Sequence, residues 1–256
     1  MDDTWRFIDT GERTGTWNMG FDERLARRLV AGQGGPVLRL FRWKPWAVSL
    51  GYNQRTEEID AEACRRDGID IVRRPTGGRA ILHAEELTYS VVMHSGRKGV
   101  HEVYNDVSRA LVRGLGAFGV GVTLQRSQPD FARTYHDPSS VPCFTSSARY
   151  EIEWKGRKLV GSAQRRFSGG DRDVVLQHGS ILCGPAHQRL ADYLAADDAL
   201  RDRMRTSLRE KTADLAAIRG SSVPMDDLAA CIRKGFEEEW GIGFADMSYD
   251  GEYLHG

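Results

Sequence analysis

Two residues in the middle of the chain, Cys143 and Lys158, are of the types that form a reactive thiol. A thiol is a weak nucleophile until it loses its proton, and a nearby ammonium lowers its pKa from about 8.5 toward neutrality. Cys143 follows Pro142 where a loop ends, a position that both holds and exposes a nucleophile. The alternative is structural, with Cys143 as a small buried hydrophobe and Lys158 exposed on a hairpin. Taken alone, the two residues favour that alternative.

A second polar segment, residues 73–79, reads Arg-Arg-Pro-Thr-Gly-Gly-Arg between two strand-like runs. Adjacent glycines permit a positive φ or bring the backbone close to a ligand, and Gly77 is expected at such a point. Three arginines in seven residues supply donors for a phosphate or carboxylate. A Gly-Gly hairpin turn with solvated arginines explains the segment equally well.

Alternation and helical spacing predict the elements that must position these residues. Asn18 is expected to cap the first helix, and Lys155-Gly156 to turn a hairpin that places Lys158 opposite Glu153. The loop 127–141 shows no periodicity and ends beside Cys143. Strands are expected at 5–8, 37–43, 47–52, 69–72, 80–83, 87–93, 122–125, 150–154, 158–164 and 176–180, and helices at 18–30, 57–67, 101–118, 187–195, 198–208 and 225–240.

Composition limits the class of protein. With 256 residues, 40% of them hydrophobic, the chain can bury one large α+β core. Lys plus Arg equals Asp plus Glu at 36 each, so no basic excess indicates nucleic acid. No leader pattern and no apolar run of about 20 residues is present, so a cytoplasmic protein without a membrane partner is expected. The four cysteines form no C-x-x-C pair and the histidines no H-x₃-H pattern, so no metal or disulfide framework is predicted.

Several motifs in collinear order resemble the biotin/lipoate protein ligase and transferase superfamily. The resemblance covers residues 5–240 and is strongest to the cysteine-dependent octanoyltransferases of the LipM type. The motifs are Trp5-Arg-Phe-Ile-Asp9, Leu50-Gly-Tyr-Asn-Gln54, residues 73–79 with His83 and Leu87-Thr-Tyr-Ser90, Cys143-Phe144 with Tyr150-Glu151, Lys158-Leu-Val-Gly-Ser-Ala-Gln164 and Leu176-Gln-His-Gly-Ser180.

The resemblance implies a role for individual residues. Cys143 is the acyl acceptor, and Lys158 lowers its pKa and later polarises the thioester carbonyl. Arg79 stands where many ligases have glycine. This departure weakens the expectation of a loop that binds an acyl-adenylate. The residues implied to bind the substrate are Arg73, Thr76, Gly77, Gly78, Arg79, His83, Gly161, Ser162, Ala163 and His178.

The resemblance also implies the fold, the reaction and the partners. One domain over 1–256 is expected, a mixed β-sheet with helices mainly on one side and with the C-terminal helices, from about 187, as a small appendage. The reaction moves an octanoyl group from acyl carrier protein to a lysine of the glycine-cleavage H protein or another lipoyl-domain protein, without a cofactor. The alternatives are an ATP-dependent lipoate–protein ligase and a catalytically silent acyl-binding module. Both protein partners are expected to be acidic and to dock on a positive rim, formed by Arg73, Arg74, Arg79, Arg165 and Arg166.

Overall fold

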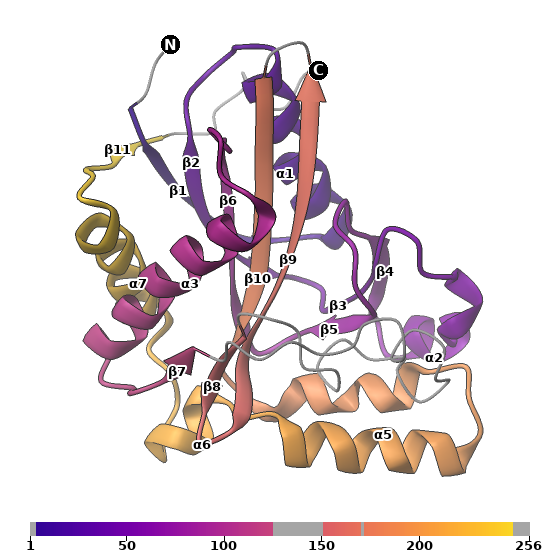
Figure 1. The fold of residues 1–256 in the computed structure, drawn as a ribbon. Helices are drawn as coiled ribbons and strands as arrows, with labels where there is room; N and C mark the ends of the chain where they lie inside the picture. Colours follow the sequence, from indigo (N-terminus) through magenta and orange to yellow (C-terminus); the bar gives the residue numbers. More distant parts are fainter. Residues whose placement is uncertain (1–3, 125–150, 170–171, 248–256) are drawn as a thin grey trace.

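The computed structural model describes residues 4–124, 151–169 and 172–247 (Figure 1). Cys143 lies outside these ranges. The described residues form an eight-stranded sheet in the order β11-β1-β2-β6-β10-β9-β8-β7 and a three-stranded sheet in the order β4-β3-β5. The strands are β1 Arg6–Arg13, β2 Val37–Trp43, β3 Ala47–Leu50, β4 Asp70–Arg73, β5 Ile81–His83, β6 Glu86–His94, β7 Thr123–Leu124, β8 Ile152–Trp154, β9 Arg157–Gly169, β10 Arg172–Leu182 and β11 Ala245–Asp246.

Both sheets are mixed, as predicted. In the large sheet β1 runs parallel to β2 and β11, whereas β6, β10, β9 and β8 pair antiparallel in succession. In the small sheet β3 runs parallel to β4 and antiparallel to β5. The helical segments are α1 Gly15–Val30, η1 Thr56–Glu58, α2 Ala61–Arg66, α3 Val100–Ala117, η4 Pro185–Tyr193, α5 Asp198–Lys211, α6 Leu215–Arg219 and α7 Met225–Trp240, where η marks a 3₁₀ helix.

Helices cover both faces of the large sheet, with more of them on one face than on the other. On β10, Val174 and Leu176 pack with Phe21 and Leu25 of α1. Val175 alternates with them and belongs to the core under α3 and α7. Because successive side chains of a strand point to opposite faces, α1 lies on one face and the pair α3 and α7 on the other. The α+β class itself is as predicted.

The C-terminal helix α7 is part of the main core and is not an appendage. Leu228, Ile232 and Phe236 are each 0% exposed and share one hydrophobic cluster with the sheet. Glycines let the two helices touch, because a Cβ at Gly235 would lie 2.4 Å from the backbone nitrogen of Gly114 on α3. The apolar stripe of residues 225–240 therefore faces α3 and the sheet. No helix in the described ranges is long and apolar enough to cross a bilayer.

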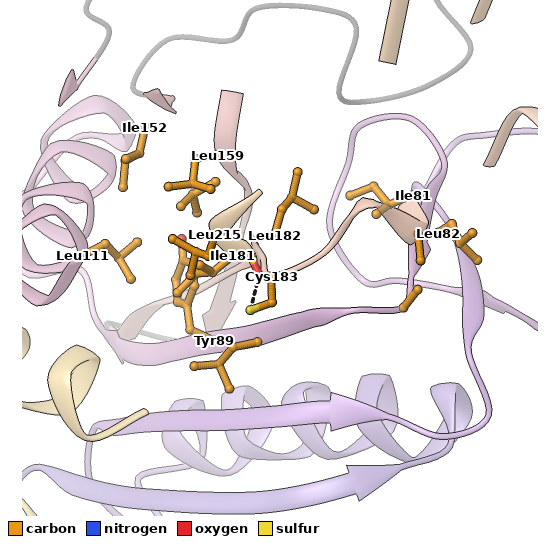
Figure 2. Packing of buried hydrophobic residues seen from close by; sticks show 14 of the residues in the cluster. Ile81, Leu82, Tyr89, Leu111, Ile152, Leu159, Ile181, Leu182, Cys183 and Leu215 are labelled. Atoms are coloured by element: carbon orange, nitrogen blue, oxygen red, sulfur yellow. Dashed lines mark hydrogen bonds between the residues drawn. The ribbon is translucent and has the colours of Figure 1, made fainter. Parts of the chain in front are cut away.

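The core beneath β10 holds one of the four cysteines. Cys183 is 6% exposed, and its sulfur donates to the carbonyl of Ile181 at 3.4 Å (Figure 2). Leu159, Leu182 and Leu215 surround this part of the core in the same view. Cys183 therefore has a packing role in this core.

The hairpin between β8 and β9 has the predicted geometry. Lys155 and Gly156 both take positive φ, at 50° and 75°. Two such residues form the turn whose twist matches the flanking strands. Lys158 accordingly pairs with Glu153 across the ladder.

Candidate active site

A pocket opens on the α1 face of the large sheet, where the small sheet meets it. Of the ten residues predicted to bind substrate, five line it: His83, Gly161, Ser162, Ala163 and His178. They come from β5, β9 and β10, strands that are far apart in the sequence. The remaining lining residues are Met19, Trp43, Arg74, Ile81, Thr88, Gly179 and Ser180.

His178 is held between a helix and a loop. Its Nδ1 lies 3.3 Å from Oδ2 of Asp22 on α1, and its Nε2 lies 2.6 Å from Oγ1 of Thr76. Burial lowers the pKa of His178 and outweighs the opposing effect of Asp22. Thr76 is fully buried, so it reaches the pocket through its contact with His178.

Asp22 belongs to a buried polar cluster beneath the pocket. Oδ1 accepts from Nη1 of Arg39 at 2.7 Å and from Oγ of Ser90 at 2.8 Å. Arg39 also donates to the backbone carbonyl of Asn18 and to Thr10. Burial by itself would raise the pKa of Asp22, but Arg39 and His178 together hold it below its usual range. Asn18 is thus a core residue of α1 and not its cap, which is Thr14.

His83 is fixed by a second carboxylate. Its Nδ1 lies 2.7 Å from Oε1 of Glu86, its Nε2 lies 2.8 Å from Oγ of Ser49, and its ring stacks on Trp43 with centroids 3.9 Å apart. Glu86 is 2% exposed and accepts on the same oxygen from Ser180 at 2.7 Å. Burial would raise the pKa of Glu86, but His83 and the hydroxyl donors lower it overall. Both pocket histidines therefore have a protein partner on each ring nitrogen.

The first two arginines of residues 73–79 hold the loop itself. Nη1 of Arg73 donates to the carbonyls of Gly51, Tyr52 and Gln54, at 2.7 to 3.0 Å. Arg74 is 2% exposed and donates to the carbonyls of Ser49, Gly77 and Arg79. The description as a solvated arginine is therefore wrong for Arg74, whereas Arg73 is exposed while it holds the three carbonyls.

Of the five arginines expected to form a positive rim, two pair with carboxylates. Arg79 pairs with Glu58 at 3.5 Å and Arg166 with Asp173 at 2.6 Å. Arg73 and Arg74 bind backbone carbonyls, as described above. Arg165 lies over the ring of Tyr52, which is 51% exposed. Carboxylates thus offset the charges of Arg79 and Arg166, whereas hydrogen bonds to neutral carbonyls leave the charges of Arg73 and Arg74 intact. Steering by the rim is expected to be weaker than five uncompensated charges would give.

Gly78, not Gly77, carries the positive φ of the loop, at 97°. A Cβ at Gly77 would meet nothing within 4 Å. The close approach lies at Gly51 instead, where a Cβ would stand 1.9 Å from the carbonyl oxygen of Gly78. Contact between the end of β3 and this loop is therefore possible only with glycine at position 51.

These contacts predict opposite behaviour for two substitutions. Gly51→Ala should push the loop out of place, destabilise the fold by at least about 1–3 kcal/mol and lower acyl transfer. Gly77→Val should leave the midpoint of thermal unfolding close to wild type, because its side chain enters open space, and should lower transfer if the acyl group passes there. Thermal unfolding and transfer rates measured on both proteins test this. An unfolding midpoint in Gly51→Ala equal to that of wild type would contradict it.

Lys158 is buried, and its partner is a carboxylate that the sequence analysis did not assign. Lys158 and Glu151 form an ion pair with side chains 6% and 5% exposed. The backbone carbonyl of Lys158 accepts from Ala213, which ties the start of β9 to the segment before α6. The structural alternative of an exposed hairpin lysine is therefore wrong. Because Cys143 lies outside the described residues, its contact with Lys158 stays a prediction.

Two other cysteines are poor nucleophiles. Burial raises the pKa of Cys64 to about 11 and that of Cys183 to about 12, so thiolate is scarce at neutral pH at either site. Cys231 lies half-buried on α7, against the main core. The described residues contain no group of three or more His, Cys, Asp or Glu side chains that could hold a metal ion.

Sequence comparison supplies the family. Residues 14–237 match the model of the lipoyl protein ligase A/B catalytic domain. The chain belongs to this family. An octanoyltransferase LipM from Kyrpidia tusciae is 39% identical over 244 residues, covering 93% of this chain and 88% of the relative. The octanoyltransferase LipM of Bacillus subtilis is 35% identical over 243 residues, covering 92% and 86%. The predicted superfamily is thereby confirmed.

Solved structures agree on the fold of this lipoyl ligase family member. A lipoate-protein ligase A bound with ATP superposes with a TM-score of 0.75 at 23% identity, covering 97% of this chain and 90% of the other. A bipartite lipoate protein ligase, studied with its E2 lipoyl domain from Thermoplasma acidophilum, gives 0.74 at 23% identity, covering 97% and 88%. At this identity the likeness concerns the fold alone.

Proposed function

We propose that the chain transfers an octanoyl group from acyl carrier protein, through a thioester on Cys143, to a lysine of the glycine-cleavage H protein or another lipoyl-domain protein. The observation that carries the proposal is the 39% identity to an octanoyltransferase LipM over 93% of the chain. The pocket described above supports it, because the predicted substrate-binding residues of β5, β9 and β10 meet there.

The proposed reaction consists of two balanced acyl transfers. In the first, the Cys143 thiolate attacks the thioester carbonyl, and the thiolate of the carrier leaves. In the second, the neutral amine of the acceptor lysine attacks the enzyme thioester, an amide forms, Cys143 leaves as a thiolate, and the proton lost by the amine goes to water. Splitting the transfer in this way lets aminolysis start from a carbonyl that is already held and oriented. Neither step consumes ATP.

The pocket suits an acyl chain for two reasons. Met19, Trp43 and Ile81 give it apolar wall area. The histidines in its wall have both ring nitrogens hydrogen-bonded within the protein, so an apolar chain leaves none of these atoms unpaired. Each buried CH₂ of the chain then contributes about 0.8 kcal/mol to binding.

Transfer without ATP is the result that we expect. Purified protein with octanoyl-acyl carrier protein and glycine-cleavage H protein should yield octanoylated H protein at the same rate with and without ATP. Mass spectrometry of the H protein gives the readout. Activity only with free acid plus ATP would support the ligase alternative, and no acylation of enzyme or acceptor would support the silent module.

Because a nucleophilic thiol needs a reducing compartment, we also propose a cytoplasmic location.

A further inference from the structure

The neutral ring of His178 has one tautomer that is consistent with its surroundings. A carboxylate only accepts, so Nδ1 donates its hydrogen to Oδ2 of Asp22, 3.3 Å away. On a neutral ring Nε2 is then an acceptor, and the Thr76 hydroxyl, 2.6 Å away, donates to it. Burial favours this neutral ring because it lowers the pKa of His178.

Asp22 is itself held so that one oxygen is left for His178. Arg39 and Ser90 both donate to Oδ1, at 2.7 and 2.8 Å, and Oδ2 faces the histidine. Asp22, Arg39 and Thr76 are each 0% exposed. In such an interior, rotation of the His178 ring would leave buried polar atoms without hydrogen-bond partners. Water could not take the place of those partners, so the rotation would cost free energy.

Thr76 is where this chain of contacts meets the loop. The carbonyl of Thr76 accepts from the backbone nitrogen of Tyr52 at 2.9 Å, and its hydroxyl faces His178 on the large sheet. The next residue, Gly77, borders open space. The bond between Thr76 and His178 thus ties the loop of residues 73–79 to the wall of the pocket.

We propose that Asp22 is a positioning residue of this site: through His178 it orients Thr76 and so fixes the loop of residues 73–79 beside the acyl group. This inference rests on the proposed function for what the loop contacts. Neither Asp22 nor Thr76 lines the pocket, so both act through His178, which does.

A double-mutant cycle on octanoyl transfer tests the coupling. Asp22→Asn offers an amide that can donate to Nδ1 and select the other tautomer, and Thr76→Val removes the hydroxyl at nearly constant volume. Each single substitution should lower kcat/KM by about a hundredfold or less, as expected for a small misplacement of a positioned group. The double variant should be no worse than the more impaired single variant. Losses that multiply would overturn the proposal.

Glu23→Gln is the matched control, because it makes the corresponding carboxylate-to-amide change one position along α1, where Glu23 pairs with Arg27 at the surface and not with His178. It should keep kcat/KM within about threefold of wild type, a small effect of the kind expected of substitutions outside the coupled network. A loss as large as that of Asp22→Asn would mean that any such change on α1 lowers transfer, and would overturn the proposal.

The tautomer of His178 gives a readout that does not depend on activity or on the folding of Asp22→Asn. Nitrogen-15 shifts of the ring in wild-type protein should show Nδ1 protonated and Nε2 not, and Nε2 should shift in Thr76→Val while Nδ1 stays protonated. Protonation at Nε2 in wild type would overturn the proposal. If the wild type transferred no octanoyl group, the proposed function would fail while these spectra still decided the role of Asp22.

Discussion

Cys143→Ala should lose octanoyl transfer by about 10³-fold or more, the scale seen when a covalent nucleophile is removed. Wild-type protein incubated with octanoyl-acyl carrier protein should carry one octanoyl group on the peptide that contains Cys143. Hydroxylamine should release that group, because it cleaves a thioester and leaves an amide intact. The substitution should remove the adduct and leave the unfolding temperature near that of wild type.

The other cysteines are the controls for this result. Cys64→Ala, Cys183→Ala and Cys231→Ala should each still form the adduct. Cys64 and Cys183 are buried with their pKa values raised to about 11 and about 12, and Cys231 packs against the core. Iodoacetamide at neutral pH should therefore modify Cys143 before Cys64 or Cys183. Full transfer by Cys143→Ala, or ATP-dependent turnover by that variant, would reject the thioester route in favour of the ligase mechanism.

The sequence correctly predicted the elements in which the spacing of apolar residues matches the side chains that the fold buries. The four-residue spacing of Leu228, Ile232 and Phe236 gave the helix 225–240 with its observed ends, because the stripe that defines the pattern is the one that meets α3. The helix predicted at 57–67 is in fact two segments. Asp60 caps α2, because its side chain accepts hydrogen bonds from the backbone nitrogens of Glu62 and Ala63. The 3₁₀ helix η1 therefore ends before Asp60, and α2 begins after it.

The polar cluster behind the pocket could not be predicted in the same way. Asp22 and His178 are 156 positions apart, so no local pattern links them. One signal was present: Asn18 and Asp22 occupy the same helical face as Leu25 and Leu29, and Arg39 shares a strand face with Phe41. A charge on an apolar face indicates a buried partner, but the fold decides which residue it is. Glu151 was likewise quoted in a motif, and its pairing with Lys158 followed only from the structure.

Lys158→Met should have two separable effects, one on stability and one on the thiol. Glu151 would be left as a buried carboxylate without its cation, and breaking a buried pair in this way costs about 3–5 kcal/mol. If Lys158 is also the cation beside Cys143, the thiol pKa should rise toward its ordinary value, and alkylation of Cys143 at neutral pH should slow. Transfer should fall with it.

The double variant Lys158→Met/Glu151→Gln separates these effects. Removing both charges should recover most of the lost stability, because a neutral pair leaves no buried ion uncompensated. It should not recover transfer or the rate of Cys143 alkylation, because the ammonium is still missing. Lys158→Arg keeps the charge, so it should retain more of the alkylation rate than Lys158→Met. Denaturant unfolding and alkylation rates across pH give both quantities on the same proteins. If the double variant alkylated at the wild-type rate, Lys158 would be a structural partner of Glu151 and the thiol would owe its reactivity to another group.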